Sequence, residues 1–168
     1  MLRLARGRII NISSLSGMTA GPYVGAYAAS KHAFEALSDS LRLELRGFGI
    51  HVAVIQPADI ATPIWEKSQR LADSLRDELM PSIEGRVPPE VQEIYRQDIV
   101  AMRQATAGFA SKAIPVERVV RAVSHALGSR RPKTRYRVGA KTWGVALILR
   151  RLPDRIRDRI VLKNLGMR

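Results

Sequence analysis

Two short runs rich in β-branched residues, with a helical stretch between them, constrain the fold of this chain most strongly. The first run is Arg8–Ser14 (RIINISS) and the second is His51–Ile55 (HVAVI). Neither run alternates regularly between polar and apolar residues, which is typical of strands buried on both faces of a parallel sheet. From Tyr27 to Arg46 apolar residues recur instead at helical spacing. A strand, a helix and a strand in this order predict a right-handed βαβ crossover, so we expect an α/β fold.

The rest of the chain predicts more helices and one more strand. A third strand is expected at 134–138, before Gly139, which brings the sheet to about three parallel strands with flanking helices. Amphipathic helical stretches are expected at 64–79, 91–102, 116–127 and 143–165. Prolines are expected to interrupt the middle stretches and to break the last one; they are Pro81, Pro88, Pro89 and Pro153.

The first predicted helix carries a pair of residues suited to proton transfer. Tyr27 and Lys31 stand four residues apart, so their side chains share one helix face. A neighbouring ammonium favours the phenolate form of a tyrosine and makes it a usable general acid/base. Ser14 follows the first strand, at the edge where open α/β sheets bind ligands, and its hydroxyl can hold a carbonyl or alcohol oxygen. A tyrosine and a lysine at this spacing are common on helices, so the pair alone is a weak signal.

The combination of motifs is far more specific than the pair. The segment GRIINISSLSG, followed by YAASK with Tyr27 thirteen residues after Ser14, strongly resembles the active-site segment of the short-chain dehydrogenases/reductases. The resemblance implies that Ser14, Tyr27 and Lys31 are the catalytic residues. In that family the tyrosine exchanges the proton, the serine holds the reacting oxygen, and the lysine activates the tyrosine and steadies the cofactor ribose.

A second segment extends the resemblance. The run QPADIATP after the second strand is similar to the family's proline-glycine motif that ends in a threonine and contacts the nicotinamide end of the cofactor. The residues implied to bind the cofactor are Tyr27, Lys31, Pro57, Ala58, Ile60 and Thr62. Ala58 stands where the family has glycine, and alanine would strain the turn if this position required a positive φ. Asp59 beside it fits a turn-capping role or contact with the substrate.

The resemblance implies a redox enzyme with a small hydrophobic substrate. It implies NAD(P)-dependent interconversion of an alcohol and a ketone or aldehyde, with the choice between NAD and NADP not readable from this sequence. The segments RYRVG and LPDR near the end resemble the retinol- and steroid-dehydrogenase-like branch of the family. This branch favours a lipid-like alcohol or carbonyl compound as the substrate.

The same resemblance marks a missing part. In the family a glycine-rich phosphate-binding turn precedes the serine strand, and none precedes Arg8 here. The resemblance therefore implies the C-terminal half of a doubly wound, Rossmann-type domain, with residues 1–140 as a partial catalytic half-domain and 141–168 as a tail. We expect the chain alone to bind a dinucleotide poorly, to expose apolar surface and an open strand edge, and to form a homo-oligomer if it is rescued by self-association. The alternative is a catalytically inactive, truncated fragment that acts as an interaction module.

The positive charge is concentrated at the end of the chain. Of the net charge of +13, +11 belongs to residues 129–168, which hold thirteen Lys or Arg and two Asp. A nucleic-acid-binding surface would join such charge to aromatic platforms or a reading helix, and this segment has only Tyr136 and Trp143. We therefore expect no nucleic-acid partner. The basic amphipathic tail favours either a terminal helix packed on the domain or peripheral contact with a membrane surface.

Composition narrows the compartment and the chemistry. The chain contains no cysteine, which excludes disulfides and thiol catalysis and fits a reducing compartment. Its histidines lack partners at metal-binding spacing, so we assign no metal. The first residues lack the apolar run of a signal peptide, and the apolar stretch at 143–149 is far shorter than the ~20 residues of a spanning helix. We expect a cytoplasmic protein whose tail is the candidate membrane contact.

Overall fold

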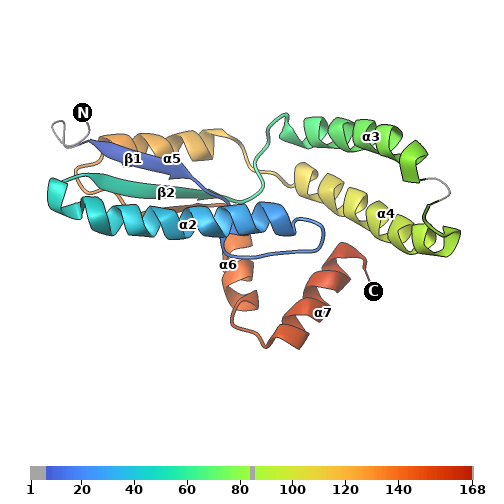
Figure 1. Ribbon diagram of the computed structural model, residues 1–168. Helices are drawn as coiled ribbons and strands as arrows, with labels where there is room; N and C mark the ends of the chain where they lie inside the picture. The colour runs from blue at the N-terminus through green and yellow to red at the C-terminus, as the bar shows by residue number, and fades with distance from the viewer. Residues whose placement is uncertain (1–6, 84–85, 168) are drawn as a thin grey trace. The chain divides into compact units, whose positions relative to one another are not determined.

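The computed structural model describes residues 7–83 and 86–167 of the chain (Figure 1). These residues form two compact units. Of the described residues, 7–60 and 114–153 form the first unit, and 61–83, 86–113 and 154–167 form the second. The division predicted at residue 140, between a half-domain and a tail, stays a prediction.

A parallel sheet organises the first unit. Within the described residues its strands are β1 (Arg8–Ile12), β2 (His51–Pro57) and β3 (Arg135–Val138), in the spatial order β1-β2-β3. Ile10 lies opposite Ala53, and Ile55 lies opposite Tyr136. Three parallel strands with flanking helices confirm the predicted fold class. β1 ends at Ile12 rather than at the predicted serines, because the chain turns there into a short 3-10 helix, η1 (Leu15–Gly17).

Two helices cover the two faces of the sheet. Figure 1 shows α2 (Gly25–Leu45) in front of the strands and α5 (Glu117–Gly128) behind them. The contact between the sheet and α5 is apolar, and its buried residues are Ala53, Ile55, Tyr136 and Val138 of the strands and Ala126 of α5. The face toward α2 also carries polar groups, since the amide of Asn11 donates to the hydroxyl of Ser38 at 2.8 Å. One apolar cluster of the core therefore lies between the sheet and α5, and further buried apolar residues include Ala28 of α2 and Val52 and Val54 of β2.

The ends of α2 follow from its sequence. The predicted helix over Tyr27–Arg46 is present, and it begins two residues earlier, at Gly25. It passes into a second 3-10 helix, η2 (Arg46–Phe48), and stops at Gly49, whose φ of 68° is left-handed. Glycine adopts this conformation without a steric penalty, so Gly49 terminates the helix and releases the chain into β2.

Three helices make up the second unit. They are α3 (Ile64–Ile83), α4 (Pro89–Ser111) and α7 (Asp154–Leu165), and α4 packs against both α3 and α7. The prediction that Pro81 interrupts the helix was wrong: it lies inside α3. Only two residues follow it in the helix, so its missing N–H costs one bond in the last turn. Pro89 is the first residue of α4, a position that tolerates proline because its N–H would be unpaired there anyway.

The basic end of the chain forms two helices rather than one. α6 (Ala140–Leu149) belongs to the first unit and α7 to the second, and the chain breaks between them at Pro153 as predicted. No helix among the described residues is long and apolar enough to cross a membrane. Peripheral contact of this segment with a membrane stays a prediction.

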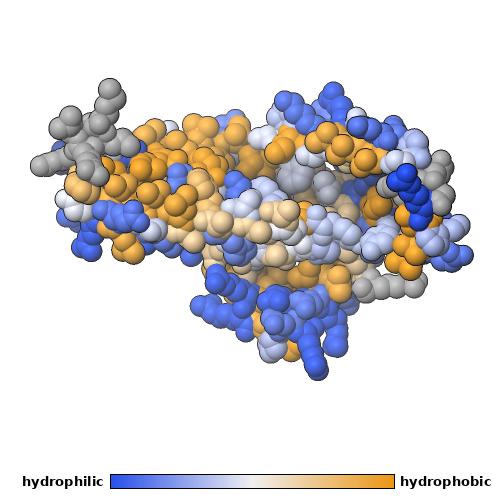
Figure 2. Space-filling view, in the orientation of Figure 1, coloured by the Kyte–Doolittle hydropathy of each residue, from blue (hydrophilic) through white to orange (hydrophobic). Residues whose placement is uncertain are grey.

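Apolar side chains lie on the surface of the first unit. Ile12 of β1 is 45% exposed, and Leu37 and Leu43 of α2 are 53% and 64% exposed. Figure 2 shows orange, hydrophobic surface over the sheet and its helices. β1 also forms an edge of the described sheet, with β2 as its strand partner there. The expected exposure of apolar surface and of a strand edge is thus present in the structure.

Candidate active site

Ser14 lies just beyond the end of β1, where the chain turns toward α2. It caps η1, and its Oγ accepts a hydrogen bond from the backbone N–H of Ser16 at 3.1 Å. The backbone N–H of Ser13 still bonds to Ile55 on β2 at 2.8 Å, so the turn starts from a fixed point on the sheet. Because the Ser14 hydroxyl acts as an acceptor in this contact, its own proton remains for donation to another oxygen.

Tyr27 and Lys31 lie in the first two turns of α2. The Nζ of Lys31 lies 5.7 Å from the centre of the Tyr27 ring, within the range of a cation–π contact. The same Nζ donates to the carbonyl oxygen of Ile12 at 3.2 Å, two residues before Ser14. The structure therefore brings Lys31 to both the tyrosine and the end of the serine strand. Tyr27 is 49% exposed, so its phenol is open to a ligand.

Gly17 allows the loop between β1 and α2 that contains Ser14, here called the serine loop, to lie close to α2. A β-carbon added at Gly17 would lie 2.9 Å from the Cγ of Glu35, 2.9 Å from the Oγ of Ser13 and 3.2 Å from the carbonyl oxygen of Lys31. Real β-carbons are not found at contacts of 2.9 Å, so only glycine lets the loop approach this far. No role was predicted for Gly17 from the sequence, because the contact joins residues that only the fold brings together.

The residues predicted to bind the cofactor divide between the two units. Pro57 is the last residue of β2, the backbone N–H of Ala58 donates to Val138 at 2.9 Å, and Ile60 pairs with Ile114. These three belong to the first unit with Ser14, Tyr27 and Lys31. Thr62 belongs to the second unit, and its place in a cofactor site stays a prediction.

Alanine does not strain the turn at position 58. Among the described non-glycine residues only Tyr23 has a positive φ. The β-carbon of Ala58 is accommodated because Gly139, with a φ of +107°, faces it. A β-carbon at Gly139 would lie 2.8 Å from that of Ala58. The glycine that the close contact requires is therefore on the other side of the contact, after β3.

Asp59 is a half-buried carboxyl beside this turn. Burial raises its pKa above the ordinary value of 3.8. Its backbone carbonyl accepts from Ile114 at 2.9 Å and holds the turn in place. The structure thus supports a turn role for the backbone of Asp59, while the side chain pays a desolvation penalty when it is ionised.

We expect Asp59→Asn to stabilise the chain more at about pH 7 than at about pH 3.5. The folded-state pKa of Asp59 lies above its unfolded value, so the folded state holds the proton more tightly. The penalty is absent below the unfolded value and develops as pH rises through the folded pKa. Thermal unfolding at both pH values measures this, with Asp77→Asn on the exposed face of α3 as the control. Equal shifts at the two pH values would contradict the assignment of the penalty to ionised Asp59.

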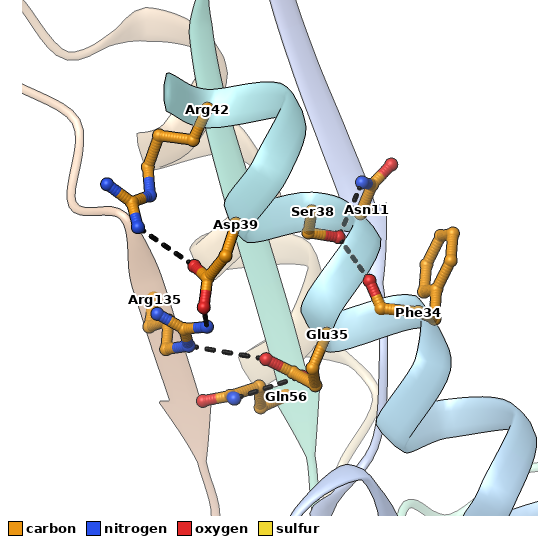
Figure 3. Close-up of polar contacts among 8 residues, drawn as sticks. All are labelled: Asn11, Phe34, Glu35, Ser38, Asp39, Arg42, Gln56 and Arg135. Atoms are coloured by element: carbon orange, nitrogen blue, oxygen red, sulfur yellow. Dashed lines mark hydrogen bonds and ion pairs between the residues drawn. The ribbon is translucent and has the colours of Figure 1, made fainter. Parts of the chain in front are cut away.

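A polar cluster lies under the same helix, and sequence reasoning did not identify it. Figure 3 shows Glu35 and Asp39 of α2 facing Arg135 of β3, with Gln56 of β2 beside them. Arg135 donates to Glu35 at 3.2 Å and to Asp39 at 2.7 Å. The hydrogen bond from Arg135 holds the pKa of Asp39 below its ordinary value. The sequence feature that could have indicated this cluster is the acidic residue Glu35, four positions after Lys31.

The predicted catalytic residues do not line a cavity that lies elsewhere on the first unit. That cavity measures about 770 Å³, lies between α5 and β3, and includes the side chains of Arg118, Arg121 and Lys133. Ser14, Tyr27 and Lys31 are not among its lining residues. They lie instead on an open surface at the carboxyl end of β1. Among the described residues no group of His, Cys, Asp or Glu is placed to hold a metal ion.

Comparison with known proteins agrees with the motif. Residues 1–72 match the family model described as short chain dehydrogenase. The chain is 32% identical to the NADPH-dependent 3-dehydrocapnine reductase of Ornithobacterium rhinotracheale over 95% of this chain and 51% of that protein. It is 35% identical to retinol dehydrogenase 16 of Homo sapiens over 88% of this chain and 44% of that protein. The chain spans about half the length of the curated relatives it matches.

A solved structure shares the fold. A short-chain dehydrogenase from Burkholderia cenocepacia, crystallised in complex with NADP, matches with a TM-score of 0.55 and 22% sequence identity. The match covers 99% of this chain and 50% of that one. At this identity the likeness supports the parallel-sheet fold and not the chemistry. The resemblance predicted from the sequence motifs, including its retinol-dehydrogenase-like branch, is confirmed by the sequence relatives.

Proposed function

The chain belongs to the short-chain dehydrogenase/reductase family, and we propose that it carries the Ser-Tyr-Lys site of an NAD(P)-dependent oxidoreductase. The reaction is the interconversion of a hydrophobic alcohol and its ketone or aldehyde. One observation carries the proposal: Lys31 lies against the Tyr27 ring and also bonds to the Ile12 carbonyl, just before Ser14. Ser14 thus lies just after the carboxyl end of β1, and Tyr27 and Lys31 lie on α2.

The proposed roles follow from the chemistry of each side chain. In the oxidation direction the Ser14 hydroxyl donates to the alcohol oxygen, and Tyr27 takes the hydroxyl proton as the C–O bond gains double-bond character. A dinucleotide held beside Tyr27 and Lys31 would supply the hydride acceptor for the same carbon. In the reduction direction Tyr27 returns the proton to the carbonyl oxygen. The Nζ of Lys31 lies 5.7 Å from the centre of the Tyr27 ring, so its positive charge faces the negative charge that the phenol oxygen carries while the proton is on the substrate.

The donors present suit the nicotinamide end of either cofactor. The exposed phenol of Tyr27 and the half-buried ammonium of Lys31 are hydrogen-bonding groups that match the hydroxyls of a ribose. The turn at Ala58 is unstrained, so the alanine is no obstacle to a cofactor beside it. NAD and NADP share this end of the molecule, so the proposal holds for both. The sequence relative described as an NADPH-dependent reductase supports it.

A chimera tests the proposed function. This chain would replace the matching segment of the Ornithobacterium reductase, which aligns with 95% of the chain, and so receive that protein's remaining half. Oxidation of NADPH and NADH would be followed with a panel of hydrophobic ketones and aldehydes, and reduction of NADP and NAD with the matching alcohols. We expect turnover that Ser14→Ala lowers by about 10²-fold or more.

The same measurement distinguishes the oxidoreductase from the alternative, an inactive interaction module. A chain that acts only as an interaction module predicts a folded chimera that binds NADPH without turning over any compound of the panel. That outcome, obtained with cofactor binding shown by calorimetry, would overturn the oxidoreductase proposal. Turnover insensitive to Ser14→Ala would retain the reaction and remove the assigned site.

A further inference from the structure

The serine loop contacts α2 at the turn between Lys31 and Glu35. The carbonyl oxygen of Lys31 and the Cγ of Glu35 both lie against Gly17, at 3.2 Å and 2.9 Å from the position of its absent β-carbon. Glu35 follows Lys31 by four residues, so the two side chains lie on one face of the helix. Any shift of this turn therefore moves Lys31 and the loop of Ser14 together.

Glu35 is a buried carboxylate that joins this turn to the other two strands. It is 8% exposed. One oxygen accepts from the amide nitrogen of Gln56 at 3.0 Å, and the other accepts from Nε of Arg135 at 3.2 Å (Figure 3). Gln56 is fully buried, and its side-chain oxygen has no partner in the described part of the chain. Its amide nitrogen donates to Glu35, so a single side chain of α2 is bonded to both β2 and β3.

The opposite end of the same contact is also held. Arg135 donates from Nη2 to Asp39 at 2.7 Å, and Asp39 accepts from Arg42 at 2.9 Å. Two successive turns of α2 are thus bound to one guanidinium on β3. A guanidinium presents its donors in a rigid planar fork, so this contact defines the rotation of the helix as well as its distance from the sheet.

We propose that Glu35 is a positioning residue of the catalytic site: its bonds to Arg135 and Gln56 set the height and rotation of α2, and thereby the placement of Lys31 and of the Ser14 loop. This inference rests on the proposed oxidoreductase function. Catalytic groups must lie within about 0.5 Å of their productive positions. A small shift of this turn of α2 therefore lowers the rate of the chemical step. Binding of the substrate depends less on that placement.

The test compares two identical substitutions on one helix. Glu35→Gln keeps the shape of the side chain and removes its charge, and Glu44→Gln does the same at an exposed position where the carboxylate bonds only to Ser40 among the described contacts. The kcat and KM of both variants are measured in the chimera described above, at a temperature well below the unfolding temperature of each variant. We expect Glu35→Gln to lower kcat by about 10- to 100-fold with KM changed by less than about threefold. Glu44→Gln should match the parent.

A second variant guards against failure of Glu35→Gln to fold. Arg135→Lys keeps the positive charge facing Glu35 and loses the planar fork, and it should show the same fall in kcat at nearly unchanged KM. If either variant lowers the unfolding temperature while kcat per folded molecule stays at the parent value, Glu35 is merely structural and the proposal is overturned. Tyr27→Phe identifies the other kind of failure: if that variant keeps full activity, the site itself is wrong, whatever Glu35 does.

Discussion

Tyr27→Phe is expected to lower kcat/KM of the chimera that contains this chain by about 10²- to 10⁴-fold, the usual cost of removing a general acid/base. The substitution deletes only the hydroxyl. The ring, which lies 5.7 Å from Nζ of Lys31, remains in place. Tyr27 is 49% exposed, so the free energy of unfolding should change by less than about 0.5 kcal/mol. A large loss of rate with no loss of stability distinguishes a chemical role from a packing role.

The control for this prediction is a second exposed tyrosine. Tyr95 lies on α4 in the other unit and is 54% exposed, so Tyr95→Phe removes the same hydroxyl from a similar environment. Steady-state kinetics and chemical denaturation of both variants give the comparison. Turnover of Tyr27→Phe within a few-fold of the parent would remove Tyr27 from the reaction.

Gly17→Ala is expected to destabilise the chain by about 1–3 kcal/mol, the usual cost of overpacking a well-filled site. The added β-carbon would meet Glu35 and Ser13 at 2.9 Å and the backbone of Lys31 at 3.2 Å. Glu35 is held on both carboxylate oxygens and cannot swing away without breaking its bonds to Gln56 and Arg135. The loop must therefore move from the helix, which would also lower activity by displacing Ser14.

Gly25→Ala is the matched control, because nothing lies within 4 Å of the β-carbon it would add at the first residue of α2. Alanine is the better helix former, so this variant should be neutral or slightly stabilised. Urea denaturation of both variants measures the difference in free energy of unfolding. If Gly17→Ala is as stable as Gly25→Ala, the close approach of loop and helix is not a constraint on the fold.

Local patterns were sufficient to predict the strands and the first helix. The runs at Arg8–Ser14 and His51–Ile55 reflect burial on two faces of a sheet, and that burial leaves a local record in residue type. The same record misplaced Pro81, which the structure places inside α3, two residues before its last residue.

The sequence by itself determined the family, the order of the strands along the chain and the identity of Ser14, Tyr27 and Lys31 as candidates, since these depend on residue type at short spacing. Only the tertiary structure decided how that site is held. Glu35 and Arg135 are 100 residues apart, and Ala58 fits only because Gly139 lies against it. Contacts of this kind depend on which side chains the sheet brings face to face, and no local periodicity encodes that choice.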